Sequence, residues 1–210
     1  MQNSDVARIF IRFVVLLSPL TVREMAHART AYRLVDPTAR LLGRVSLNPI
    51  VHADIIGTVV FPLVSMVSGA MLIGWAKPVP VNLRYLRHPR RDYMLVAAAG
   101  PVRNLILAAF AALLLAIVPI SPQTLGESNV SVPIAELLSG LVYLNVLLAV
   151  FNMLPIPPLD GGNVLAGLLP PNLAEIFNKV RPYGFVLLYA LILSNGFSYI
   201  VIPPARFILR

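Results

Sequence analysis

The sequence contains no cysteine, few charged residues and only 9 acidic ones. The lack of cysteine excludes disulfide bonds and thiolate metal ligands. Only 12% of the 210 residues are charged whereas 58% are hydrophobic, and a soluble domain needs a more polar surface. The net charge of +8 comes from basic residues beside apolar runs, and no nucleic-acid-binding signature accompanies them. The composition therefore indicates a membrane protein and no nucleic-acid partner.

Several apolar segments are long enough to cross a bilayer, which takes roughly 20 helical residues. They comprise residues 9–32, 93–120, 133–154 and 183–202. The apolar stretch 57–76 is interrupted by proline and glycine, so it either spans or dips in and returns. We predict an all-α membrane protein, a multi-pass helical bundle in the cell membrane, formed as a single membrane-embedded domain over residues 1–210.

Two polar regions between these segments carry further expectations. Residues 41–49 have the pattern of an extended hairpin or edge strand, which adds a small strand-bearing loop region to the bundle. Residues 77–92 are rich in proline and arginine, and we place them on the cytoplasmic side because basic loops favour that side.

The first apolar segment carries an incomplete metal-binding motif. The pattern His-Glu-x-x-His places two imidazoles one helical turn apart, with a carboxylate beside them to act on a metal-bound water. Glu24 and His27 fit this pattern, but Arg23 stands at the first histidine position. A guanidinium stays protonated and offers no lone pair, so Arg23 cannot be a ligand. Taken alone, Glu24 and His27 fit a satisfied polar pair inside a bundle better than a metal site.

Six further motifs follow along the chain. They are Asp36-Pro37-Thr38-Ala39-Arg40-Leu41-Leu42-Gly43-Arg44, Asn48-Pro49, Gly74-Trp75-Ala76-Lys77-Pro78-Val79-Pro80-Val81-Asn82, Pro89-Arg90-Arg91-Asp92, Ala99-Gly100-Pro101-x-x-Asn104 and Asn152-x-Leu154-Pro155-x-Pro157-Pro158-Leu159-Asp160-Gly161-Gly162. With Glu24-x-x-His27, their order and spacing resemble the site-2 protease family of intramembrane zinc metalloproteases. The chain is most similar to the compact bacterial branch without added regulatory domains, over nearly its whole length.

The resemblance implies a role for each matching residue. Glu24 corresponds to the general base, and His27 and Asp160 correspond to ligands of one zinc ion. Asn104 corresponds to a residue that contacts the substrate backbone or the reacting oxygen. The implied substrate is a single-span membrane protein within the lipid bilayer. For His52 we keep three interpretations, as a loop residue, a substrate-binding gate residue or a replacement ligand.

Two arginines depart from the family pattern. With Arg23 in place, His27 and Asp160 are one protein ligand short of the three usual for a catalytic zinc. Arg103 stands beside Asn104, where the family mostly has a small residue. An arginine inside a membrane costs roughly 2.5–3.5 kcal/mol on insertion scales, so we expect Arg23 to pair with Glu24 or Asp160 and to replace the charge of the metal.

Three functions are compatible with these residues. The first is an intramembrane zinc metalloendopeptidase that cleaves transmembrane substrates, with low or absent activity because of Arg23. The second is a non-catalytic relative that binds membrane helices without cutting them. The third is a small transporter or channel whose buried charges line a pathway.

Overall fold

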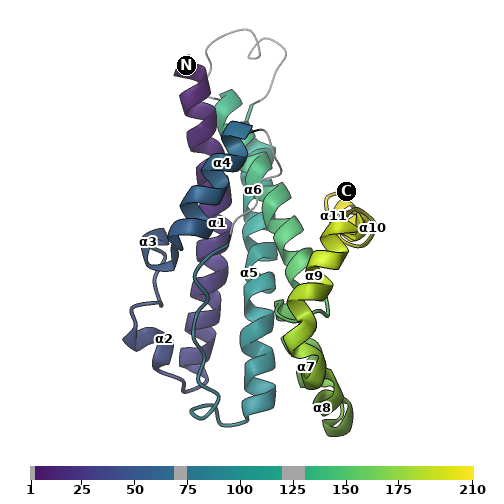
Figure 1. The fold of residues 1–210 in the computed structure, drawn as a ribbon. Helices are drawn as coiled ribbons and strands as arrows, with labels where there is room; N and C mark the ends of the chain where they lie inside the picture. The colour runs from purple at the N-terminus through teal and green to yellow at the C-terminus, as the bar shows by residue number, and fades with distance from the viewer. Residues whose placement is uncertain (1–2, 69–74, 120–130) are drawn as a thin grey trace.

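The computed structural model describes residues 3–68, 75–119 and 131–210, and these residues form helices with no strand. Three long helices stand side by side, α1 (Asn3–Arg33), α5 (Pro89–Ile117) and α6 (Ser131–Asn152). In Figure 1, α1 and α6 run in the same direction and α5 runs in the opposite one. The predicted all-α multi-pass membrane fold is confirmed.

Length and composition make three helical segments of the described residues able to cross a membrane. These are Pro89–Ile117, Ser131–Asn152 and Pro171–Leu193. The third joins α8 (Pro171–Val180), η2 (Arg181–Tyr183) and α9 (Gly184–Leu193). α1 is longer than any of them but is not one of the three. Its face toward the bundle carries the polar residues Arg23, Glu24 and His27.

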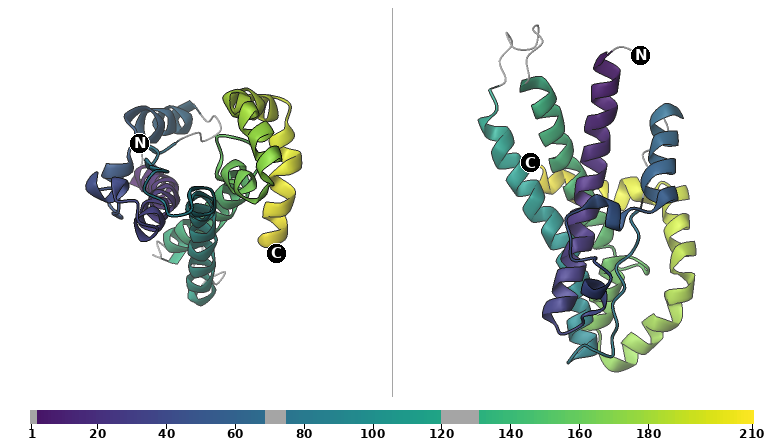
Figure 2. Two further views of the ribbon diagram at one scale, coloured as in Figure 1. Left: turned by 90° about the horizontal axis from the view of Figure 1, so that it is seen from below. Right: turned by 90° about the vertical axis from the view of Figure 1, so that its left-hand side faces the viewer.

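The last predicted span, residues 183–202, is not one helix. Asn195 adopts the left-handed conformation with φ 56°, which ends the helical run. Two short helices follow it, α10 (Gly196–Ile200) and α11 (Ile202–Ile208). Figures 1 and 2 show that α9, α10 and α11 lie on the opposite side of α5 and α6 from α1.

The strand or hairpin expected at residues 41–49 is also wrong. This region lies between two short helices, α2 (Thr38–Leu41) and α3 (Pro49–His52). Gly43 closes α2 with φ +69°, and the Arg44 N–H donates to the Ala39 carbonyl over 2.8 Å. The Asn48 side chain caps α3 by accepting from the Ile50 N–H over 3.0 Å. Local caps therefore satisfy the backbone groups that a strand would have paired with a neighbour.

The stretch 57–76 leaves its starting point and returns to it. It begins in η1 (Ile55–Val60) and α4 (Phe61–Ser68), and residues 69–74 lie outside the described part of the chain. The Trp75 N–H donates to the Gly57 carbonyl over 3.0 Å, and the Thr58 hydroxyl donates to the Trp75 carbonyl over 2.8 Å. Because its two ends are hydrogen-bonded together, the chain returns to its starting point, which agrees with the re-entrant alternative and not with a single crossing.

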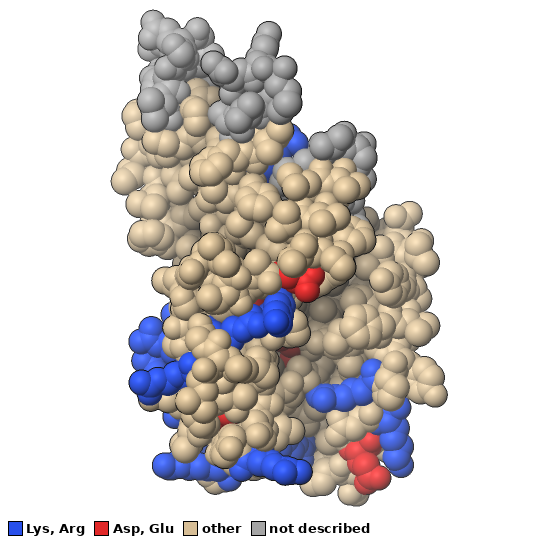
Figure 3. All heavy atoms as spheres, turned by 60° about the vertical axis from the view of Figure 1, so that its left-hand side comes forward, with Lys and Arg blue, Asp and Glu red and all other residues tan. Residues whose placement is uncertain are grey.

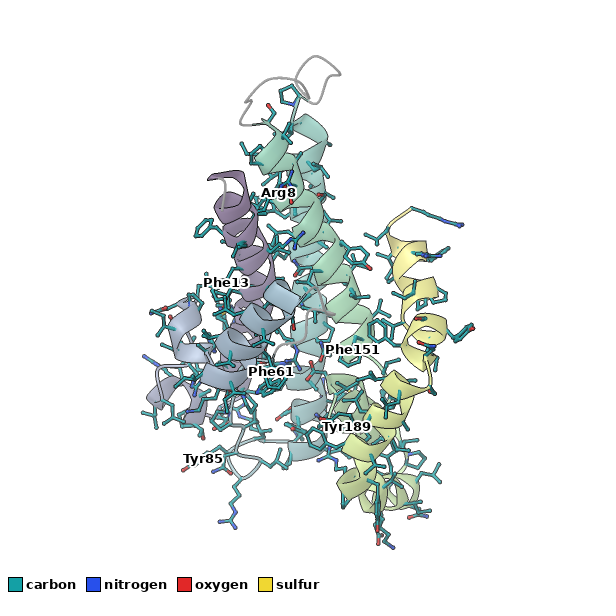
Figure 4. All side chains as sticks on the ribbon, turned by 45° about the horizontal axis from the view of Figure 1, so that its top comes forward. Arg8, Phe13, Phe61, Tyr85, Phe151 and Tyr189 are labelled. Carbon is teal, nitrogen blue, oxygen red and sulfur yellow. The ribbon has the colours of Figure 1, made fainter. Side chains whose placement is uncertain are left out.

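Small side chains fill the contacts between the long helices. Ala108 and Ala111 of α5 and Ala149 of α6 are buried, which lets the helix backbones approach closely. A second cluster, which includes Val201, holds the C-terminal helices against the end of α6. Phe151 points toward these helices in Figure 4, and its ring centroid lies 5.7 Å from that of Phe197.

The outer surface is mostly apolar. Many large hydrophobic side chains are exposed, as expected where lipid replaces water. On the face shown in Figure 3, most Lys and Arg side chains gather toward the lower end, whereas the upper part is nearly free of charge among the described residues. That lower end holds the start of α5 and the helix α8.

Candidate functional site

One turn of α1 brings Arg23, Glu24 and His27 against Asp160, the first residue of α7 (Asp160–Leu168). Arg23 Nη1 lies 2.7 Å from Glu24 Oε1. Its Nε and Nη2 lie 2.9 and 2.8 Å from Asp160 Oδ2. We expected Arg23 to pair with one acid, but its guanidinium pairs with both and bridges them.

His27 is oriented by a backbone group of α5. Its Nδ1 lies 2.7 Å from the Val96 carbonyl oxygen, and because a carbonyl can only accept, Nδ1 carries the hydrogen. The other ring nitrogen, Nε2, is thereby directed at Asp160 and lies 3.3 Å from Oδ2. A histidine that donates one N–H to a backbone carbonyl and presents the other nitrogen to a site has the arrangement found for metal ligands.

Glu24 already has a hydrogen-bond donor on each carboxylate oxygen. Oε1 accepts from Arg23, and Oε2 accepts from the Val79 N–H over 3.1 Å. Its side chain is only 4% exposed. The segment that supplies Val79 is anchored on both sides of that residue, because the Lys77 N–H donates to the His52 carbonyl of α3 and the Asn82 N–H donates to Asp36 Oδ2 just after α1.

Glycines allow the elements of the site to meet. A Cβ at Gly100 would lie 2.6 Å from the His27 ring and 2.9 Å from Arg23 Cγ, so only glycine lets α5 contact this face of α1. A Cβ at Gly161 would lie 2.2 Å from the Met153 carbonyl oxygen. The start of α7 therefore packs directly on the backbone at the end of α6, which sets the position of Asp160.

Asn104 and His52 do not join this group of side chains. Asn104 follows Gly100 by one turn of α5 and is fully buried, and its amide has no hydrogen-bond partner among the described residues. His52 is also buried, and its Nε2 lies 2.8 Å from the Ser46 carbonyl oxygen at the other side of the loop. Their assignment as substrate-contacting residues stays a prediction.

The side chains present do not fit a catalytic zinc site. Within the described residues no group of three or more His, Cys, Asp or Glu side chains could hold a metal ion. His27 and Asp160 face each other, but the third ligand position belongs to Arg23. Two nitrogens of that guanidinium also occupy Asp160 Oδ2, the oxygen nearest His27. A divalent cation would have to displace a cation that is already hydrogen-bonded there.

Two contacts of the site could not be read from side-chain motifs. The Val79 N–H and the Val96 carbonyl are backbone groups, and any residue type other than proline supplies an N–H. The contact at Gly100 had a signal in the sequence, because Gly100 belongs to the Ala99-Gly100-Pro101 motif and a residue without a side chain allows close helix contact.

Comparison with known proteins agrees with this architecture. The model of Peptidase family M50 matches residues 116–193. The chain is 37% identical over 190 residues to "Putative zinc metalloprotease YwhC" of Bacillus subtilis, covering 90% of this chain and 83% of that protein. It is 30% identical to "Putative zinc metalloprotease Rip2" of Mycobacterium tuberculosis strain H37Rv, covering 89% of this chain and 69% of the relative. No solved structure matches the chain.

The Rip2 protein of Mycolicibacterium smegmatis is 28% identical, over 87% of this chain and 66% of its own length. These matches confirm the family that the motifs indicated. The chain belongs to Peptidase family M50, the site-2 proteases, and is a membrane protein.

Proposed function

We propose that this chain is a member of the family that binds transmembrane helices in the cell membrane without hydrolysing them, or that hydrolyses them only at a very low rate. The observation that carries the proposal is the bridge from Arg23 to both Glu24 and Asp160. It supports a site in which a guanidinium supplies the positive charge that a zinc ion supplies in an active metalloprotease.

The bridge acts against hydrolysis in two ways. Arg23 removes one of three protein ligands and places a positive charge where a metal ion would sit. It also engages Glu24, whose second oxygen is held by the Val79 N–H, so the carboxylate is not free to accept a proton from water. Both effects act on the same step, because zinc supplies a nucleophilic hydroxide and polarises the scissile carbonyl when it is bound.

The proposed binding of membrane helices depends on the surroundings of the site. The segment around Val79 is held against α1 at the level of Glu24, and α6 carries a single charged residue, Glu136, within its first two turns. A bound single-span protein would therefore contact apolar surroundings of a site in which a guanidinium replaces the metal ion. This is the partner that we propose for the chain.

One substitution should restore a zinc site, because His27 is already oriented as a ligand. Its Nε2 still faces Asp160 because the Val96 carbonyl fixes the ring. Arg23→His would therefore supply a third ligand one helical turn from His27 and release Glu24 from its ion pair. We expect about one zinc ion per chain and cleavage of a transmembrane peptide to appear together in this variant.

The test compares the wild-type chain, Arg23→His and the double variant Arg23→His, Glu24→Gln in proteoliposomes. Zinc content is measured by elemental analysis, and cleavage is followed with a synthetic transmembrane peptide. We expect the double variant to bind zinc without cleaving. Cleavage by the wild-type chain with stoichiometric zinc would overturn the proposal. Zinc-independent solute uptake by the wild-type chain would favour the transporter instead.

A further inference from the structure

Arg103 lies in the middle of a helix that is long and apolar enough to cross a membrane. It is the central residue of the 29-residue α5, with about 21 Å of helix on either side. The hydrocarbon core of a bilayer is about 30 Å thick, so the ends of this helix lie beyond both edges of the core. A charged side chain at this depth is costly unless an opposite charge or a polar cavity accompanies it.

No acidic side chain pairs with Arg103 among the described residues. The arginine and lysine ion pairs there join Arg23 to Glu24 and Asp160, and Lys179 to Glu175, and His27 also faces Asp160. The two acids of the functional site are thus already engaged by Arg23. Arg103 is half-buried, so its side chain is neither inside the core nor fully on the outer surface.

The surroundings of Arg103 are suited to contact with another helix. Ala99 lies one turn before it and Leu107 one turn after it on the same stripe of α5, and both are half-buried. The small side chain of Ala99 allows a second helix backbone to approach closely at that end of the stripe. On the neighbouring stripe, Val102 and Ile106 are exposed and apolar, as expected for a surface facing lipid or an apolar partner. Arg103 is therefore a single cation within an apolar, partly covered surface.

Arg103 also lies close to the functional site along the helix. Gly100, which contacts His27 and Arg23, precedes it by three residues, or about 4.5 Å of helical rise. A helix that binds along the stripe through Ala99, Arg103 and Leu107 would therefore pass beside the site. The unpaired Arg103 side chain would then face the central part of the bound helix.

We propose that Arg103 selects the partner of this chain, by pairing with an Asp or Glu side chain in the central part of a bound transmembrane helix. This inference rests on the proposed function, since it requires that transmembrane helices bind. The carboxylate supplies the charge that Arg103 lacks within the described part of the chain, and the arginine in turn makes the buried acid of the partner tolerable. The pair therefore favours partners that have an acidic residue at mid-membrane depth over those that do not.

The test measures binding of three synthetic transmembrane peptides to the full chain in proteoliposomes, by energy transfer between fluorescent labels. The peptides differ only in a central Glu, Gln or Lys. We expect the Glu peptide to bind the wild-type chain about tenfold more tightly than the Gln peptide, as for a strong interhelical polar contact. Arg103→Leu should remove this difference and Arg103→Lys should retain most of it.

Charge reversal provides the decisive arm. Arg103→Glu should bind the Lys peptide better than the Glu peptide, which a loss of folding could not produce. Arg12→Leu, which removes an exposed arginine from α1, is the matched control and should leave the preference unchanged. Equal binding of the Glu and Gln peptides to the wild-type chain would overturn the inference and leave the proposed function standing.

Two further outcomes separate the alternatives. If Arg103→Leu weakens all three peptides equally, Arg103 only balances the charge of the Arg23 site and the inference is wrong. If no peptide binds the wild-type chain at all, both the inference and the proposed function fail.

Discussion

Two nitrogens of the Arg23 guanidinium contact the same carboxylate oxygen of Asp160. Both Nε and Nη2 of Arg23 lie within 2.9 Å of Asp160 Oδ2, and the same oxygen is 3.3 Å from His27 Nε2. Arg23 lies in α1 and Asp160 in α7, so this contact joins two residues that are 137 positions apart in sequence. The cation thus links α7 to the bundle as a metal ion would.

The first prediction concerns stability. Arg23→Met removes the guanidinium but keeps an apolar stem of similar length, which leaves Glu24 and Asp160 without their shared cation. Breaking a buried pair in this way typically costs about 3–5 kcal/mol, so the free energy of unfolding should fall by that amount. Unfolding in detergent, followed by circular dichroism, measures it.

The control for this substitution is Lys179→Met. Lys179 and Glu175 are 3.5 Å apart, but their side chains are 73% and 74% exposed, so solvent weakens the pair. We expect no measurable change in unfolding. If Arg23→Met proves as stable as the wild-type chain, the two acids do not depend on the guanidinium.

The second prediction concerns metal removal. Because the guanidinium already occupies Asp160, a zinc chelator should leave the thermal midpoint of the wild-type chain unchanged. Arg23→His should instead gain stability with added zinc, by about 2.7 kcal/mol when free zinc exceeds the dissociation constant a hundredfold. Thermal scans with and without chelator test both expectations, and a chelator-sensitive wild-type midpoint would contradict the first.

The sequence predicted the features that follow from length and charge. Apolar runs of about 20 residues placed α5 and α6, because a bilayer requires helices of that length. The cost of an arginine inside a membrane predicted that Arg23 would pair with an acid. The bridge to both acids depends on how α7 packs on α6, and that geometry is set by Gly161 in contact with the Met153 backbone.

Other features depend on backbone contacts that residue types do not reveal. The orientation of His27 comes from the carbonyl of Val96, which every residue type carries. The helices at both ends of residues 41–49 come from caps such as Asn48, which compete with strand formation. The break at Asn195 had a signal, since Asn-Gly dipeptides mark turns, but the surrounding apolar composition concealed it.

The third prediction tests the packing that positions Asp160. In Gly161→Ala the new Cβ would lie 2.2 Å from the Met153 carbonyl oxygen, and this backbone cannot move without shifting the end of α6. Overpacking of this kind typically costs about 1–3 kcal/mol, and we expect the upper end of that range. Zinc binding by an Arg23→His background should be lost as well.

Gly43→Ala is the comparison for Gly161→Ala. Gly43 has φ +69°, but a Cβ there would meet nothing within 4 Å. Its cost should be limited to the left-handed conformation, about 1–2 kcal/mol, with zinc binding by the Arg23→His background retained. Equal loss of zinc binding in both variants would mean that general destabilisation, and not the position of Asp160, explains the effect.

The fourth prediction separates stability from binding at Asn104. Its side chain is fully buried, and neither amide atom has a hydrogen-bond partner among the described residues. Replacing such a group by an apolar one of similar shape removes a desolvation cost, so Asn104→Leu should unfold no more easily than the wild-type chain. If Asn104 contacts the bound helix, the same substitution should weaken peptide binding by about tenfold, in keeping with a lost interhelical polar contact.

Asn145→Leu is the matched variant for Asn104→Leu. Asn145 is equally buried, but its Nδ2 donates to the Leu141 carbonyl over 2.7 Å within α6. This substitution removes a hydrogen bond that is made, so it should not raise stability and should leave peptide binding unchanged. Loss of stability in Asn104→Leu, with peptide binding intact, would show that Asn104 is a structural residue of the bundle.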